Sequence, residues 1–167
     1  KGVGFLYASS ADFDSYLHGG DQEQKKRAGT ENLAAIVGMV ATLKEDLNDQ
    51  VEHCQKLCAL KTTFLEEIAG LDYYLNESNH QLPYVVNIGF PGQKNDLLLL
   101  RLDLEGISIS TGSACTAGIV QISHVLEAFY GPDSHRLKES VRISLSPLNT
   151  EEELKQLAQT LKNIIGD

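Results

Sequence analysis

Residues 30–69 read TENLAAIVGMVATLKEDLNDQVEHCQKLCALKTTFLEEIA, and this stretch decides the fold. Apolar residues recur in it at intervals of three and four, the spacing of a helix that buries one face. The apolar positions of its first half are Leu33, Ile36, Val37, Val40, Leu43 and Leu47. Gly70 follows the stretch as a plausible C-cap. The spacing therefore predicts one long helix from Thr30 to Ala69.

The residues before this helix predict part of a larger domain. KGVGFLYA at 1–8 is typical of a buried strand, and the polar, glycine-rich residues 9–30 predict a loop. Because the leading strand stands alone, we expect residues 1–30 to be the incomplete tail of a large domain. The chain also opens without methionine, so we expect a fragment of a longer protein.

Short strands and helices alternate beyond Gly70. Strands are predicted at 84–90, 107–110 and 141–145, and short helices at 96–104 and 123–130. Thr150 and Glu153 have the spacing of a capping box that opens a last helix. This order predicts an α+β fold, with residues 31–167 forming the long helix and a small C-terminal domain that it carries.

Composition excludes several classes of function. The chain has 167 residues, of which 42% are apolar and 22% charged, which is typical of a folded protein. A net charge of -9 argues against general nucleic-acid binding, which requires cations to neutralise phosphates. Apolar runs are too short for a membrane span, and no signal peptide is recognisable. Three cysteines without a paired pattern predict a reduced, cytoplasmic compartment.

A cysteine lies among small residues in STGSACTAG at 110–118, between a predicted strand and a predicted helix. Such a loop leaves a thiol within reach of other molecules, and the thiolate is the nucleophilic form. Cys115 is therefore a candidate catalytic nucleophile. The alternative is a buried thiol that packs as a small apolar residue, as free cysteines often do.

Alternation along VRISL at 141–145 directs Arg142 to the opposite face of its strand from Val141 and Ile143. The planar guanidinium suits a carboxylate, which it binds through two parallel hydrogen bonds. Arg142 is therefore a candidate substrate-binding residue. The alternative is a solvated arginine on an open sheet face.

Thr30 follows the basic run KKR at 25–27, at the predicted start of the long helix. Free N–H groups at a helix start attract phosphate, and Thr30 adds a hydroxyl, so it is a candidate cofactor-binding residue. The alternative is an ordinary N-cap beside a solvated basic loop.

No metal site is predicted. Cys54 and Cys58 lie four residues apart on one helix face with His53 beside them, but a structural zinc site requires a fourth ligand. We interpret the two cysteines as packing residues.

Four segments together resemble the NifS/IscS-like cysteine desulfurases, in the order that family has them. HGGDQE at 18–23 with RAGTEN at 27–32 is similar to the family's HGGGQE and RSGTEN, and STGSACT at 110–116 is similar to SSGSACT. VRISL at 141–145 with NTEEEL at 149–154 resembles IRFSLGRFTTEEEI, and KGVGFLY at 1–7 resembles KGVGALY. The SGSAC type of loop favours this branch over the SufS-like one.

The resemblance implies a homodimeric fold-type-I enzyme that uses pyridoxal phosphate to convert L-cysteine into L-alanine. It implies that Cys115 becomes the persulfide, that Arg142 holds the substrate carboxylate, and that Thr30 reaches the cofactor phosphate of the neighbouring subunit. A sulfur-acceptor protein, either an iron–sulfur scaffold or a tRNA-thiolation protein, is the implied partner. No direct nucleic-acid contact and no membrane contact are implied.

Departures from the family pattern limit what this chain is expected to do alone. The lysine that forms the Schiff base lies upstream of the KGVG run in the family, and Lys1 is not that lysine, so we expect the isolated chain to be inactive. Asp21 replaces a glycine, and SPL at 146–148 replaces GRF beside Arg142. Two alternatives stay open: a selenocysteine lyase or degenerate paralogue of the same fold, and a non-enzymatic sulfur-acceptor or docking domain.

Overall fold

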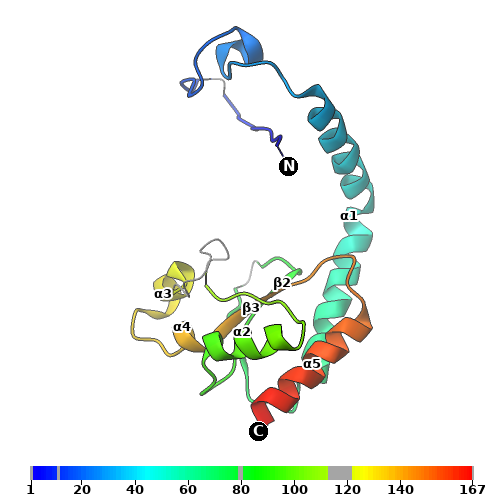
Figure 1. The fold of residues 1–167 in the computed structure, drawn as a ribbon, viewed down its shortest axis with the longest axis vertical. Coiled ribbons are helices and arrows are strands. Elements are labelled where there is room, and N and C mark those ends of the chain that lie inside the picture. The colour runs from blue at the N-terminus through cyan, green and yellow to red at the C-terminus, as the bar shows by residue number, and fades with distance from the viewer. Residues whose placement is uncertain (1, 11, 79–80, 113–121, 167) are drawn as a thin grey trace. The chain divides into compact units, whose positions relative to one another are not determined.

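The structure is a computed structural model that describes residues 2–10, 12–78, 81–112 and 122–166 (Figure 1). The chain forms two compact units, residues 1–50 and residues 51–167. The long helix α1, Leu33–Glu67, contributes to both. The mixture of helices with one small antiparallel sheet confirms the predicted α+β fold.

The opening residues do not form the predicted strand. Residues 2–8 have no regular secondary structure, and Phe5, Leu6 and Tyr7 are 71%, 74% and 85% exposed. A strand needs a neighbour for its backbone hydrogen bonds, and none of the described residues supplies one. The predicted loop is confirmed, because the described residues of 9–30 contain only the short 3-10 helix η1, Gln22–Lys25, and one bridge from Leu17 to Arg27.

Helix α1 confirms the predicted long helix but with shorter ends. Asn32 is its N-cap, since its Oδ1 accepts from the Ala35 amide at 3.2 Å and its carbonyl from the Ile36 amide at 2.9 Å. Thr30 therefore precedes the cap and does not open the helix. At the other end the helix stops at Glu67, and Gly70 does not take the left-handed conformation of a C-cap.

Only the second half of α1 buries its apolar face. Leu33, Val37 and Leu47 are 70%, 69% and 61% exposed, because unit 1 offers them no core among the described residues. In contrast, Leu60 and Phe64 are 2% and 0% exposed. The structure therefore confirms the helical period that the sequence predicts, but the apolar face of the first half is not buried among the described residues.

The sheet of unit 2 has three antiparallel strands in the order β1-β2-β3. They are β1, Tyr74–Leu75; β2, Val85–Gly89; and β3, Ser140–Ser144. One face is apolar, with Ile88 and Val141 fully buried against the second half of α1 and against α5, Glu151–Gly166. Along β3 the buried residues alternate with Arg142 and Ser144, as predicted.

Short helices complete unit 2 (Figure 1). They are α2, Asn95–Leu104; α3, His124–Tyr130; and α4, Arg136–Glu139. The first two were predicted, and α4 was missed because a single turn carries no periodic signal. The predicted strand at 107–110 is reduced to one bridge between Ser110 and Arg142.

The predicted capping box opens α5. The Glu153 amide donates to Thr150 Oγ1 at 3.2 Å, and the Thr150 amide donates to Glu153 Oε2 at 3.0 Å. The hydrogen bond from the Asn149 side chain, and after it the bond from the Thr150 amide, lower the pKa of the Glu153 carboxyl by stabilising its charge.

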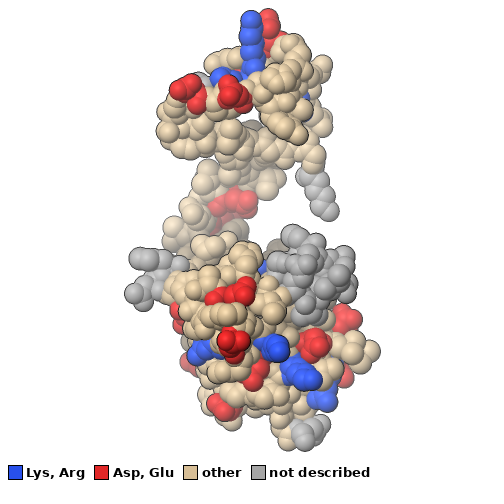
Figure 2. Space-filling model, turned by 90° about the vertical axis from the view of Figure 1, so that its left-hand side faces the viewer, with Lys and Arg blue, Asp and Glu red and all other residues tan. Residues whose placement is uncertain are grey.

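Charged side chains of both signs lie interspersed on the face of unit 2 seen in Figure 2, without one basic patch. In the described part of the chain, no helix is both long and apolar enough to cross a membrane.

Candidate functional site

Arg142 lies in β3, on the polar face of the sheet, as the strand alternation predicted. On one side its direct neighbour across the sheet is Asn87 of β2. On the other side Ser110 pairs with it: the Ser110 amide donates to the Arg142 carbonyl at 3.0 Å, and the Arg142 amide donates to the Ser110 carbonyl at 2.7 Å. Ser110 thus takes up both backbone hydrogen-bonding groups of Arg142, and Asn87 faces Arg142 on the other side without backbone bonds.

The guanidinium of Arg142 has a buried donor without a partner. Its Nε is inaccessible to solvent and donates to no other group, and it is the one buried side-chain nitrogen or oxygen of the described residues in this state. A buried polar atom left unpaired costs about 1–3 kcal/mol. A buried group in this state needs an explanation. Arginine has hydrogen-bond donors only, so the partner that suits it is an anion, which accepts.

A hydrogen-bonded network extends the polar face beyond Arg142. The Arg136 Nη1 donates to Asn76 Oδ1 at 2.7 Å. The Nδ2 of Asn76 then donates to Asn87 Oδ1 and to Ser140 Oγ, both at 2.8 Å. Four side chains, from β2, β3, α4 and the residue that follows β1, are thereby tied together.

Two tyrosines hold the guanidinium of Arg136. Its Cζ lies 4.1 Å from the centre of the Tyr74 ring and 4.5 Å from that of Tyr130. Burial, with the Glu139 carboxylate that accepts from Tyr74 Oη at 3.1 Å as a smaller cause, raises the pKa of Tyr74 to about 12. Tyr74 therefore stays neutral and keeps donating at any ordinary pH.

The candidate nucleophile Cys115 lies outside the described residues. The described residues that precede it are Ser110, Thr111 and Gly112, and Thr111 is only 9% exposed. The segment that leads to the cysteine is therefore attached to the strand that carries Arg142.

Thr30 belongs to unit 1 and has an exposed side chain. The cations before it are partly engaged: Arg27 Nη1 donates to the carbonyls of Ala28 and Gly29 at 3.1 and 3.3 Å, and Lys26 Nζ donates to that of Phe13 at 2.6 Å. Since Asn32 caps α1, the phosphate argument from the helix start does not apply to Thr30 directly.

Cys54 and Cys58 are exposed, so their interpretation as packing residues was wrong. The apolar face of α1 in this region is built by Leu57 and Leu60, and the cysteines lie off it. In the described ranges, no three metal-binding side chains are grouped to hold an ion.

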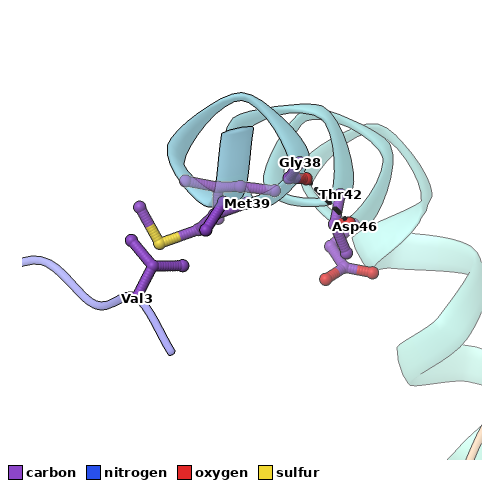
Figure 3. Close-up of a pocket in the computed structure, with 7 residues that line it drawn as sticks. Val3, Gly38, Met39, Thr42 and Asp46 are labelled. Carbon is purple, nitrogen blue, oxygen red and sulfur yellow. Dashed lines mark hydrogen bonds between the residues drawn. The ribbon is translucent and has the colours of Figure 1, made fainter. Parts of the chain in front are cut away.

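Two hollows lie away from the predicted residues. One, of about 520 Å³ in unit 1, is lined by Val3, Ala35, Gly38, Met39, Thr42, Leu43 and Asp46 (Figure 3). The Thr42 hydroxyl in it is already used, since it donates to the Gly38 carbonyl at 3.1 Å. The other, of about 270 Å³ in unit 2, lies beside Ser144 and Glu153. Neither hollow includes Thr30 or Arg142.

Sequence reasoning missed Asn76, Asn87, Arg136 and Ser140. The signal for Asn87 was present, because alternation along the predicted strand 84–90 separates it from the buried Val86 and Ile88. Asn76 and Arg136 carried no signal, since they come together only through the fold.

The model of the class-V aminotransferases matches residues 1–157 of the chain. The chain belongs to this family. Among the aminotransferase class-V relatives, IscS 1 of Bacillus subtilis (strain 168) is 42% identical over 99% of this chain and 45% of its own length. Cysteine desulfurase IscS of Dictyoglomus turgidum is 37% identical over 99% of this chain and 43% of its own length.

Solved structures agree with this assignment. A NifS-like protein from Rickettsia africae has a TM-score of 0.78 at 26% identity, over 92% of this chain and 40% of its own. Another NifS-like protein has a TM-score of 0.77 at 27% identity. The chain therefore spans less than half the length of the curated aminotransferase class-V relatives that it matches.

Proposed function

We propose that the protein containing this chain is a cysteine desulfurase, which converts L-cysteine into L-alanine and keeps the sulfur as a persulfide on Cys115. The observation that carries the proposal is the pairing of Ser110 with Arg142. It joins the start of the cysteine segment to an arginine whose buried Nε has no partner. A reaction on an amino acid needs an anion-binding group, and Arg142 supplies one beside the residue from which the cysteine segment starts.

We assign to Arg142 the binding of the substrate carboxylate. Two parallel hydrogen bonds from its planar fork would fix the carboxylate and supply the acceptor that its Nε lacks. Because both backbone groups of Arg142 bond to Ser110, the guanidinium is attached to a rigid base. Rigid attachment reduces the entropy lost when the substrate binds.

We assign to Cys115 the attack on the sulfur atom of the substrate. Cys115 is the fifth residue after Ser110, so chain connectivity keeps its Cα within about 18 Å of that of Ser110. Its thiolate attacks the substrate sulfur; a sulfur–sulfur bond forms, the carbon–sulfur bond of the substrate breaks, and that carbon takes up a proton to give L-alanine. Atoms and electrons balance as L-cysteine plus thiol giving L-alanine plus persulfide.

Pyridoxal phosphate, when bound, supplies the electron sink that makes the carbon–sulfur bond labile. Within this chain, Thr30 would contact its phosphate, from the neighbouring subunit of a homodimer. Its exposed hydroxyl makes no hydrogen bond to the described residues and so fits this role. The lysine that holds the cofactor is assigned to the part of the protein outside this chain, which is why residues 1–167 alone should be inactive.

The persulfide is passed on to a sulfur-acceptor protein of the cytoplasm, either an iron–sulfur scaffold or a tRNA-thiolation protein. The acidic chain and its mixed surface charge favour a protein acceptor over direct contact with RNA.

The test is turnover by the full-length protein with pyridoxal phosphate bound. We expect L-alanine to form from L-cysteine, and at most comparable amounts from L-selenocysteine. Turnover of selenocysteine alone would replace the proposal with a selenocysteine lyase. Absence of turnover with both substrates would contradict it and leave a docking or acceptor domain.

A further inference from the structure

We infer that Asn87 is a second residue that binds the substrate carboxylate, and that Arg136 is a positioning residue that sets the orientation of the Asn87 amide. The inference rests on the proposed function of Arg142. It is carried by a chain of hydrogen bonds whose direction is fixed at one end by a group that only donates.

The chain of bonds begins at Arg136. A guanidinium has five donors and no acceptor, so the atom of Asn76 that it meets at 2.7 Å must be the amide oxygen. The stacking of Arg136 between Tyr74 and Tyr130 holds that guanidinium in place. The orientation of the Asn76 amide is therefore set.

The fixed orientation of the Asn76 amide in turn fixes the orientation of the Asn87 amide. Its nitrogen has two hydrogens, and these donate to Asn87 Oδ1 and to Ser140 Oγ, both at 2.8 Å. Asn87 must therefore present its oxygen to Asn76. Its own NH₂ group then points to the other side of the carboxamide, and it donates to none of the described residues.

Arg142 is the neighbour of Asn87 across the sheet. The amide and carbonyl of Arg142 both bond to Ser110 on the far side of β3, so Asn87 and Arg142 form a pair without backbone hydrogen bonds between them. In such antiparallel pairs the Cα atoms are about 4.5 Å apart and the side chains are closest. The side chains of Asn87 and Arg142 thus leave the same face of the sheet from directly opposite positions, and both carry hydrogen-bond donors.

A carboxylate is the ligand that this arrangement suits. It has two oxygens with four lone-pair positions, so it accepts from Arg142 and from the neutral amide at once. If the Asn76 and Asn87 amides were reversed, Asn87 would offer an oxygen beside the carboxylate and repel it. Arg136 prevents that reversal without contacting the substrate.

The experiment compares two ligands of the full-length protein with pyridoxal phosphate bound: L-alanine, and ethylamine, which lacks the carboxylate. Binding is followed by the absorbance of the cofactor. In Asn87→Ala we expect the Kd of L-alanine to rise roughly 10- to 100-fold, the worth of one hydrogen bond to a charged group, and that of ethylamine to stay unchanged. KM for L-cysteine should rise with kcat retained.

Substitutions of Asn76 and Arg136 test the positioning role of Arg136. Asn76→Asp keeps the contact with Arg136 but cannot donate to Asn87, so it should weaken L-alanine binding as well. Arg136→Met should do the same, and Arg136→Lys, which still only donates, should restore most of the affinity. Lys138→Met, an exposed cation on the same short helix α4, is the matched control and should change nothing.

Unchanged L-alanine binding in Asn87→Ala would overturn the inference, as would an equal loss for L-alanine and ethylamine. If Arg136→Lys behaved like Arg136→Met, the positioning role would be wrong. Failure of the proposed function would look different: the wild-type protein would not turn over L-cysteine, whereas the selective loss of L-alanine binding in the variants would still be observed.

Discussion

Ser110 and Arg142 exchange both of their backbone hydrogen bonds, at 3.0 and 2.7 Å. Through this pair, the segment leading to Cys115 is fixed to the strand that carries the candidate carboxylate-binding residue. The pair also explains why the predicted strand at 107–110 is so short, since Ser110 is its one bridged residue. Two backbone bonds thus tie Arg142 to the residue from which the cysteine segment starts.

Removing one of these two bonds should impair the reaction. Ser110→Pro deletes the amide that donates to the Arg142 carbonyl, whereas Ser110→Ala keeps both backbone bonds and removes the hydroxyl, which reaches the same carbonyl only at 3.4 Å. In the full-length protein we expect Ser110→Pro to slow L-alanine formation at least about 10-fold, because one lost hydrogen bond is worth roughly 1 kcal/mol and the segment also loses its register. Ser110→Ala should stay close to wild type. Equal rates in the two variants would contradict the role of the pair.

Replacing the arginine fork by a point charge should weaken substrate binding. Lysine keeps the charge of Arg142 but cannot make two parallel hydrogen bonds to one carboxylate. We expect Arg142→Lys to raise KM for L-cysteine roughly 10- to 100-fold. Arg101→Lys, on α2, is the control, since among the described residues Arg101 donates only to the Ile164 carbonyl at the surface of the domain. A normal KM in Arg142→Lys would place the carboxylate elsewhere.

Tyr74 should make the stability of the domain depend on pH in the alkaline range. Burial raises its pKa from 10.0 to about 12 in the folded state. Below pH 10 Tyr74 is protonated in both the folded and the unfolded protein, and its contribution to stability is fully present. As the pH rises through 12 this contribution is lost, because Tyr74 releases its proton at lower pH in the unfolded protein than in the folded one. Chemical denaturation at several pH values should show this fall in the free energy of unfolding, and Tyr74→Phe should lack it.

The capping box should contribute measurably to the last helix. Thr150→Ala removes the hydroxyl that accepts from the Glu153 amide and should destabilise the domain by about 1 kcal/mol in chemical denaturation. Thr150→Ser keeps the acceptor and should be nearly neutral. An equal loss in both variants would mean that the methyl group of Thr150, and not its hydroxyl, matters.

Local patterns were sufficient for most of the fold. The period of α1, the alternation along β3 and the spacing of Thr150 and Glu153 each express one short-range rule, and the structure confirms all three. Patterns failed where a partner was required: KGVGFLYA at 1–8 has the composition of a strand but pairs with no described strand. The first half of α1 likewise has apolar spacing without a core.

In the candidate site, too, local patterns predicted one part and not the other. Arg142 was predictable because alternation alone brings it to the polar face. The network of Asn76, Asn87 and Arg136 was not, since three segments far apart in the sequence meet there through the sheet order. Capping by Asn32 instead of Thr30 was decided by side-chain geometry that the sequence does not encode locally.

The central claim is that Cys115 receives the sulfur. The direct measurement incubates the full-length protein, with pyridoxal phosphate bound, with L-cysteine in the absence of reductant, and maps persulfide by peptide mass spectrometry. Cys54 and Cys58 are internal controls, because both are exposed thiols of the same chain. We predict persulfide on Cys115, with L-alanine released and with neither control labelled. Persulfide on the controls alone, or none on any cysteine of a protein with cofactor bound, would contradict the account.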